Sequence, residues 1–472
     1  MADREEGPQG GGKLLAFIGL GFWQAWWMVA MCTDALLPDP SASPFPMGLS
    51  ILLLSLCCLG FLAVVLAREA GIGRTLGFRG KAGITAALAV AGSLGMGLVA
   101  HTGLMPLFGG ALFVGAAAAF ALGNALLLII WGSLWSTLAS GYVGRLLCAS
   151  YTAAFAVFFV VKALPTAAAV VVCALLPVAS LVGYGFARRA PRRKPVARTG
   201  LSWRDLPVVK ALAALFAANF VWGVSQRYLY VGTGDAFDLS FLFGAACLLA
   251  YTAFMFIASP TDEPAALLRP IVPALVCGIA FMQILPAEDV FLGEGVMIFG
   301  GYCLDMFVML IASDLAFRMR SSVVRVFGLA LFVARAGSLL GTCAGEWCKA
   351  AAASSSAVAM LCVVALVFVG MLLFSQTELN RFYQVPVRSA VGSLFGEKCA
   401  VIAETYGLTA RERDVLDLLA RGRSAPFISQ ELSIALGTAK NHISSIYRKI
   451  GVSDRQSLHN VIEREGADAP MS

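Results

Sequence analysis

Long, uninterrupted apolar runs constrain the fold of this chain more than any other feature. A run of about 20 apolar residues can cross a bilayer as a helix, and a helix satisfies every backbone polar group in lipid. The strands of a membrane barrel would instead be short and would alternate between polar and apolar residues. The sequence therefore predicts an all-α, polytopic membrane helix bundle of about twelve spans. The predicted spans lie near 14–37, 47–67, 82–101, 105–135, 142–162, 166–187, 207–231, 237–258, 270–286, 291–317, 323–345 and 355–375.

The composition agrees with a membrane protein. Of the 472 residues, 59% are hydrophobic and 13% are charged, whereas about 25% of the residues of a soluble domain are charged. One aqueous core cannot hide that much apolar surface. The first residues, MADREEGPQGGGK, lack the basic start and the small-residue cleavage site of a signal peptide, so we expect the first span to remain in the mature protein.

Polar segments divide the chain into domains. The basic stretch RRAPRRKPVAR separates two halves of about six spans each, and the composition becomes polar after Phe374. The predicted parts are a tail at 1–13, a membrane domain at 14–375 with halves at 14–187 and 207–375 and a basic linker at 188–206, a second linker at 376–407, a small helical domain at 408–463 and a tail at 464–472.

Lysine and arginine residues gather in the even-numbered loops. Arg68, Arg79 and Lys81 lie near the end of the second span, and Arg318 and Arg320 follow the tenth. Odd-numbered loops such as DALLPDPSASPFP are acidic and almost free of basic residues. Because basic loops stay on the cytoplasmic side, the sequence predicts that both termini are cytoplasmic.

The segment 408–463 has the pattern of four short helices. Thr409 and Glu412 form a capping box that begins the first helix, and Pro426 suits the first turn of the second. A tight connection leads to a third helix at about 436–449, LGTAKNHISSIYRK, which has exposed polar residues. Ser453 is placed to cap a fourth helix. Two short helices joined by a tight turn, the second with a polar face, predict a helix-turn-helix.

This segment resembles the DNA-binding domain of LuxR-type transcriptional regulators across about 56 residues, from LTARERDVL to GTAKNHISSIYRKIGV. The resemblance implies that the third helix enters the major groove and that the fourth pairs two copies. Two residues depart from the family, because Ala435 stands where a serine cap is usual and Ala439 where a valine is usual. We therefore expect a marginally stable domain. The DNA-facing candidates are Thr438, Lys440, Asn441, His442, Ser445, Arg448 and Lys449.

The residue types of these candidates suggest their roles. Lys440, Arg448 and Lys449 suit phosphate contacts, and the amide of Asn441 suits an adenine edge. Thr438 and Ser445 suit either phosphates or bases. An alternative for Thr438 and for His442 is a structural role in capping or packing the domain.

The membrane domain has the two-half organisation of the major facilitator transporters, which is a resemblance of topology. The loop after the second span, AGIGRTLGFRGK, keeps the glycines and basic residues usual there but lacks the usual aspartate. Ionisable residues at membrane depth mark functional sites by default. Asp305 and Arg335 lie at matching depths and are expected to pair, either as a structural ion pair or as a site.

Asp34 and Arg227 lie near the outer ends of the first and seventh spans, where a pair would gate a cavity or bind an anionic or zwitterionic ligand. Trp222 lies in the aromatic stretch NFVWGVSQRYLY of the seventh span. Aromatic residues beside a few polar groups suit a small-molecule pocket, although tryptophan and tyrosine also pack cores and membrane interfaces.

Motif searches favour a regulator over an enzyme. The chain has no Walker loop, no HExxH, no CxxC and no His/Cys cluster at metal spacing, so we expect no enzyme, cofactor or metal site. The predicted function is a membrane-tethered, one-component transcriptional regulator of the bacterial inner membrane that senses an unknown small molecule and binds DNA, as a dimer through its last helix. One alternative is a major-facilitator-like transporter with a regulatory or degenerate DNA-binding tail, and another is a membrane domain that serves only as an anchor.

Overall fold

The computed structural model shows two compact units, Met1–Leu379 and Asn380–Ser472. The structure describes residues 18–37, 49–71, 77–102, 110–138, 140–188, 203, 206–229, 235–257, 270–319, 321–373, 399, 402–403, 405–420, 424–432, 434–452, 454, 457–458 and 461.

Each of the predicted spans overlaps one helix of the first unit, so the all-α prediction is confirmed for the described residues. Nine of these helices are long and apolar enough to cross a membrane, which identifies a multi-pass membrane protein. A π-helical turn, η3 (Ser225–Leu229), continues α8. The helices are α2 (Gly19–Cys32), α3 (Leu49–Glu69), α4 (Phe78–His101), α5 (Gly110–Trp135), α6 (Ser140–Lys162), α7 (Thr166–Ala187), α8 (Leu206–Val224), α9 (Asp235–Ile257), α11 (Ile271–Ile284), α12 (Val290–Arg318), α13 (Val323–Ala350) and α14 (Ser355–Leu373).

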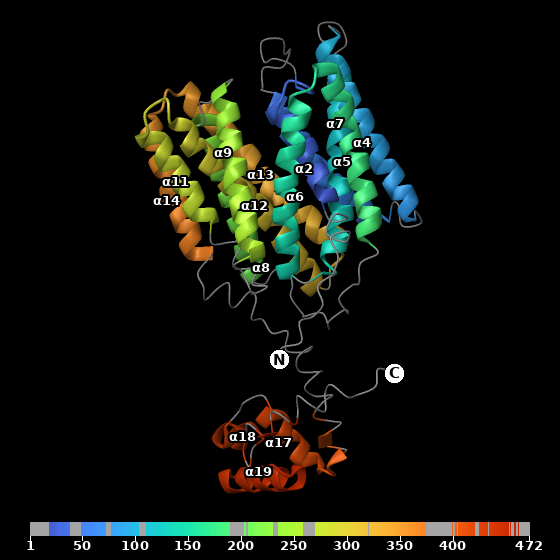
Figure 1. The fold of residues 1–472 in the computed structure, drawn as a ribbon, viewed down its shortest axis with the longest axis vertical. Coiled ribbons are helices and arrows are strands. Elements are labelled where there is room, and N and C mark those ends of the chain that lie inside the picture. The colour runs from blue at the N-terminus through green and yellow to red at the C-terminus, as the bar shows by residue number, and fades with distance from the viewer. Residues whose placement is uncertain are drawn as a thin grey trace. The chain divides into compact units, whose positions relative to one another are not determined.

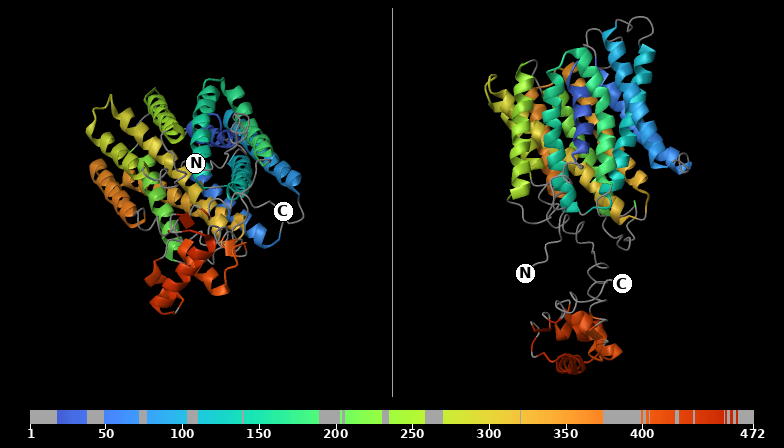
Figure 2. Two further views of the ribbon diagram at one scale, coloured as in Figure 1. Left: turned by 60° about the horizontal axis from the view of Figure 1, so that its bottom comes forward. Right: turned by 45° about the vertical axis from the view of Figure 1, so that its right-hand side comes forward.

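The helices of the first unit form two groups that follow the chain (Figure 1). In the first group α4 packs on α5 and α2 packs on α6 and α7, and in the second α8 packs on α13 and α12 packs on α9 and α11. The groups meet where α3 packs on α13 and α6 packs on α9. Figure 2 shows the same bundle from two further sides.

Glycines allow the closest helix contacts within each group. A Cβ atom on Gly21 of α2 would lie 2.4 Å from the backbone oxygen of Ser150 in α6, and one on Gly223 of α8 would lie 2.3 Å from that of Ser338 in α13. These glycines bring α2 against α6 and α8 against α13 at backbone distance.

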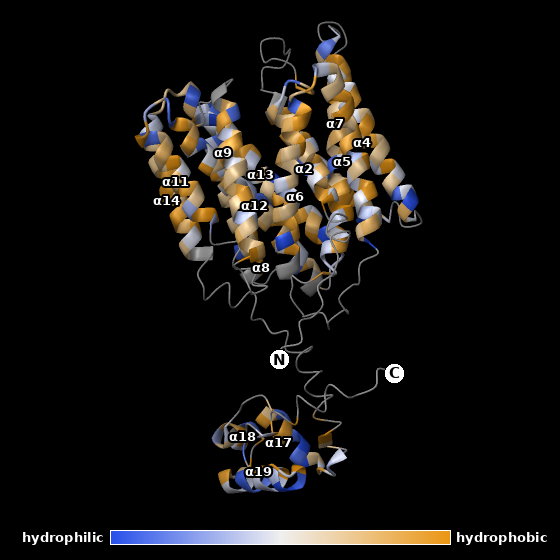
Figure 3. Ribbon diagram, in the orientation of Figure 1, coloured by the Kyte–Doolittle hydropathy of each residue, from blue (hydrophilic) through white to orange (hydrophobic). Residues whose placement is uncertain are grey.

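Hydrophobic residues predominate along the helices of the bundle (Figure 3). Large side chains such as Leu59, Phe254 and Met371 are exposed on the helix faces that do not pack on neighbours. An exposed apolar surface of this kind suits hydrocarbon rather than water.

The second unit contains α17 (Ala410–Ala420), α18 (Ala425–Glu431) and α19 (Leu436–Ile450). Its core includes Val415, Leu416, Ile428, Ile446 and Ile450. On α17 and α19 these residues lie on one face of the helix, the face that packs into the core.

The caps of the second unit follow the sequence signals in part. The backbone N–H of Thr409 donates to Glu412 Oε2 at 2.8 Å, and the N–H of Glu412 donates to Thr409 Oγ1 at 3.3 Å, so the predicted capping box is present. Gly451 ends α19 at a φ of 78°, in the left-handed region. Ser453, the predicted cap of a fourth helix, lies outside the described residues, while Asp454 Oδ1 accepts from the N–H of Ser457 at 2.8 Å.

Candidate functional site

The first candidate site is the exposed face of α19. A tight turn after α18 leads into this helix, with the N–H of Ile434 donating to the Ser429 oxygen at 3.0 Å. Ala435 is the N-cap of α19 and contributes no side-chain hydrogen bond. Ala439 and Ile446 are buried against the core. The opposite face of the helix is therefore available to a partner.

Most of the predicted DNA-facing residues lie on that exposed face. Thr438, Lys440, Asn441 and Arg448 are exposed, whereas His442 is half-buried. Ser444, which was not predicted, is also exposed. It follows Asn441 by three residues and Lys440 by four, so it shares their surface. That helical spacing was the signal that would have found it.

Two of the predicted DNA-facing residues instead contact the core carboxylate Glu412. Ser445 Oγ donates to Glu412 Oε1 at 2.7 Å, and Lys449 Nζ donates to Glu412 Oε2 at 2.7 Å. Lys449 also donates to the Gly407 oxygen at 3.1 Å. These contacts fix the rotation of α19 against α17 and direct both side chains toward the domain.

The environment of Glu412 favours its charged form. The side chain of Glu412 is 7% exposed, and its pKa falls to about 2, first because of the hydrogen bond from Lys449 and then because of those from Thr409 and Ser445. Hydrogen bonds donated to a carboxylate stabilise its charged form and so make the carboxyl group a stronger acid. Glu412 is therefore ionised at neutral pH and holds the helices together.

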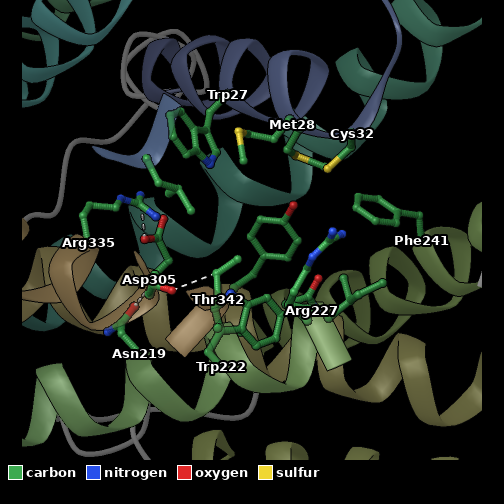
Figure 4. A pocket seen from close by; sticks show the side chains of 18 of the residues that line it. Trp27, Met28, Cys32, Asn219, Trp222, Arg227, Phe241, Asp305, Arg335 and Thr342 are labelled. Atoms are coloured by element: carbon green, nitrogen blue, oxygen red, sulfur yellow. Dashed lines mark hydrogen bonds and ion pairs between the residues drawn. The ribbon is translucent and has the colours of Figure 1, made fainter. Parts of the chain in front are cut away.

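The second candidate site is a cavity of about 550 Å³ in the first unit. It lies between the two groups of helices, because α2 and α3 supply one wall and α8, η3, α9, α12 and α13 supply the others. Its volume is in the range of small-molecule sites. Figure 4 shows the side chains of Trp27, Trp222, Arg227, Asp305 and Arg335 around it.

Asp305 and Arg335 form the ion pair that their depths predicted. Arg335 Nη2 donates to Asp305 Oδ1 at 3.2 Å. The Arg335 side chain is 11% exposed and the Asp305 side chain is 17% exposed. Tyr151 Oη donates to the other carboxylate oxygen at 2.7 Å. The Arg335 guanidinium lies 5.0 Å from the centre of the Trp27 ring, a distance at which cation–π attraction is effective.

The expected pairing of Asp34 with Arg227 is wrong. Arg227 forms its ion pair with Glu346 of α13. The reason is that α2 ends at Cys32, so Asp34 is exposed in the following turn, whereas α13 packs directly on η3. Arg227 does line the cavity, as does Trp222, whose ring lies over Gly301 of α12.

The cavity reaches one end of the helices and is closed toward the other. Its lining extends from Asp305 and Arg335, in the middle of α12 and α13, to Lys349 near the end of α13. At the opposite end Glu69 of α3 accepts from Arg325 Nε at 2.7 Å. A Cβ atom on Gly328 of α13 would lie 2.2 Å from Val65 of α3. The contact of α3 with α13 thus closes that end.

Several residues of the cavity were not predicted as site residues. Gln24, Gln226, Tyr302 and Lys349 line it, and Tyr151 holds Asp305. Gln24 and Gln226 carried a signal, because an amide within an apolar span needs a polar partner. Among the described residues no group of three or more His, Cys, Asp or Glu side chains is placed to hold a metal ion.

Residues 407–462 match the family model described as bacterial regulatory proteins, luxR family. The probable transcriptional regulatory protein NarL of Mycobacterium tuberculosis is 47% identical over 70 residues, which is 14% of this chain and 32% of that protein. The transcriptional regulatory protein DesR of Bacillus subtilis is 47% identical over 53 residues, which is 11% of this chain and 27% of that protein. The chain therefore spans about a third or less of these curated relatives. The prediction of a LuxR-type helix-turn-helix at the C-terminal end is confirmed.

The membrane unit is similar in fold to solved structures of transporters, including one of the major facilitator superfamily. A bacterial homologue of the iron transporter ferroportin in the outward-facing state has a TM-score of 0.51 and 13% identity, covering 77% of this chain and 98% of that one. The major facilitator superfamily transporter FucP in the outward conformation has a TM-score of 0.50 and 11% identity, covering 78% and 99%. The human organic anion transporter MFSD10 has a TM-score of 0.51 and 14% identity, covering 77% and 100%. At these identities the likeness shows the fold alone.

Proposed function

We propose that this chain, in which a LuxR-type domain follows a transporter-like helix bundle, is a membrane-tethered transcriptional regulator that senses a small molecule. The observation that carries the proposal is the presence of two sites in one chain. One is the exposed polar face of α19, and the other is a polar cavity between the two helix groups. The LuxR-type domain binds DNA, and the small molecule that is sensed binds in the cavity.

Both termini of the regulator lie in the cytoplasm, where the DNA is. The basic loops support this orientation, including Arg68 at the end of α3 and the stretch after α7. In this orientation the ends of α2, α8 and α13 face outward. Because the cavity extends to those ends, its ligand enters from outside the cell.

Signal transfer requires that the ligand prefers one of two states of the membrane unit. That preference then changes how the DNA-binding domains are presented or paired, through dimerisation by the last helix. Cys399 and Ile402 belong to the core of the second unit. The stretch between Leu373 and Cys399 can span about 90 Å at most, so we propose that the regulator binds DNA that lies close to the membrane.

The experiment that tests regulation is chromatin immunoprecipitation of the full-length tagged protein. We expect discrete peaks that disappear in a Lys440→Ala/Arg448→Ala double variant, because both side chains lie on the exposed face of α19. Arg413→Ala is a matched control, because it removes an exposed cation from α17. Peaks that persist in the double variant, or disappear in the control, would count against recognition by α19.

A second candidate function is solute transport with a regulatory tail. The observation that favours it is the cavity itself, which is closed at the α3–α13 contact and reaches the other helix ends. Uptake of a radiolabelled solute by vesicles, unchanged after deletion of Asn380–Ser472, would support transport over sensing.

A further inference from the structure

We infer that the cavity between the helix groups takes a small organic anion with an aromatic body. This inference deepens the sensing part of the proposed function and depends on that part for its biological meaning. It rests on the charges, the unpartnered polar atoms and the aromatic walls of the cavity.

Cations outnumber carboxylates among the residues that line the cavity. Arg227, Arg335 and Lys349 are positive, and Asp305 is negative. Glu346 pairs with Arg227 and lies three residues before Lys349 on α13, so one carboxylate lies beside two cations. Lys349 is exposed near the end of α13, so the excess positive charge lies at the mouth of the cavity. Positive charge at the mouth of a cleft attracts an anionic ligand.

Arg335 is held in a geometry that suits a carboxylate. The pair with Asp305 uses one of the guanidinium nitrogens, while a guanidinium has five N–H donors in a fixed fork. Tyr151 takes the other Asp305 oxygen, and Trp27 lies against the guanidinium. Arg335 is thereby oriented, with donors left for a second, bidentate partner.

Two buried amide atoms of the cavity have no protein partner within the described part of the chain. They are Nε2 of Gln226 and Oε1 of Gln24, and Gln24 is 1% exposed. A buried polar group without a partner is unfavourable, because it has lost its hydrogen bonds to water. The π-helical turn places Gln226 directly before Arg227 on the cavity wall. A donor beside a cation suits an anionic group, and Gln24 suits a donor group on the ligand.

Aromatic side chains form the remaining walls. Trp27 of α2, Trp222 of α8, Phe241 of α9 and Tyr302 of α12 all line the cavity. Figure 4 shows Trp27 and Trp222 on opposite sides, with Arg227 and Arg335 between the helices. Flat, apolar walls of this kind favour a planar aromatic body through stacking and edge contacts.

The test uses three naphthalene probes of matched shape and different charge, namely naphthoate, naphthylmethanol and naphthylmethylamine. Binding to the full-length protein in detergent micelles is measured by titration calorimetry. We expect naphthoate to bind about tenfold or more tightly than the alcohol, and the amine to bind most weakly. Equal or tighter binding of the amine, or no measurable binding of naphthoate, would overturn the inference.

Variants connect the binding to the proposed residues. Arg227→Gln and Lys349→Gln are each expected to weaken naphthoate binding about tenfold. Arg188→Gln is the matched control, because that guanidinium lies over Phe78, 4.6 Å from the ring centre, and does not line the cavity. Because Arg335→Gln leaves Asp305 unpaired, the double variant Asp305→Asn/Arg335→Gln is used to test this pair. Unchanged naphthoate affinity in Arg227→Gln, in Lys349→Gln and in the double variant would overturn the inference.

A promoter reporter separates failure of this inference from failure of the proposed function. If naphthoate binds and transcription does not change, the result supports the anion site and contradicts the sensing role. If transcription responds to the amine and not to naphthoate, the sensing role stands and the anion site is refuted.

Discussion

Glu412 in the DNA-binding unit and Asp305 in the membrane unit are both carboxylates that contact a cation, but their surroundings differ. Glu412 accepts from Lys449, Ser445 and Thr409, and Ala439 and Ile446 close the core beside it. Asp305 holds Arg335 and Tyr151 at the edge of a cavity whose lining includes unpartnered amide atoms. The first network is complete and fixes one arrangement of helices. The second is incomplete and retains capacity for a ligand.

The largest expected effect is from removing one charge of the Asp305–Arg335 ion pair at the cavity. Asp305→Asn leaves the Arg335 charge without its partner at membrane depth, which we expect to lower the stability of the full-length protein by about 3 kcal/mol. Thermal unfolding in detergent micelles measures this loss. Asp305→Asn/Arg335→Gln should restore most of it, because neither charge then remains. Equal stability of the single variant and the wild type would show that the pair contributes nothing.

The same variants separate a sensor from an anchor. If the membrane unit only holds the domain at the membrane, the double variant should give unchanged promoter response. We expect the response to be lost while the protein remains in the membrane, because Asp305 and Arg335 line the cavity.

The second effect is from breaking the network of Glu412. Glu412→Ala removes the acceptor of Lys449 and Ser445 and half of the capping box, and we expect it to lower the free energy of unfolding of Asn380–Ser472 by about 2–3 kcal/mol. Chemical unfolding followed by circular dichroism measures the loss. A loss below 0.5 kcal/mol, the low end for one hydrogen bond, would contradict the structural role of this carboxylate.

The network also predicts a dependence of stability on pH. The pKa of Glu412 falls from 4.5 to about 2 on folding, so its stabilisation is present above pH 4.5 and is lost as the pH falls toward 2. Glu412→Gln removes this dependence, and the difference in unfolding free energy between wild type and variant should shrink over that window. A difference that is constant between pH 5 and pH 2 would refute the contribution.

The third effect separates two cations of α19, Lys440 and Arg448, which are exposed, from Lys449, which contacts Glu412. Lys440→Ala and Arg448→Ala are each expected to weaken DNA binding about tenfold and to lower the salt slope by about one. Lys449→Ala should act mainly on stability, because Lys449 contacts Glu412 and the Gly407 oxygen. Electrophoretic mobility shifts over a salt series, with unfolding curves for each variant, test the division. A lower salt slope in a stable Lys449→Ala variant would place that residue on DNA.

The sequence predicted the helices well because their signals are local. Apolar length located every helix in the described part of the membrane unit, and Thr409 with Glu412 marked the start of α17. It predicted the Asp305–Arg335 pair from matching depths but not the partner of Arg227, because partners depend on helices distant in the chain. The predicted span at 323–345 ended before Glu346, although α13 continues to Ala350, so the partner of Arg227 was missed. Helical position alone also could not show that Ser445 and Lys449 turn toward Glu412 while Arg448 does not.

The smallest expected effect concerns the N-terminus of α19, which has no side-chain cap. Ala435 has the extended backbone of an N-cap, with φ −63° and ψ 147°, but no side-chain acceptor for the first N–H groups of α19. Ala435→Ser supplies that acceptor, so it should raise the free energy of unfolding of Asn380–Ser472 by about 1 kcal/mol. Ala435→Val is the control, because valine has no side-chain acceptor and is as poor an N-cap residue as alanine. Equal unfolding free energies for the serine and valine variants would show that capping is not what this domain lacks. A gain for serine alone, without change in DNA affinity, would show that the alanine weakens the helix while its DNA-facing surface stays the same.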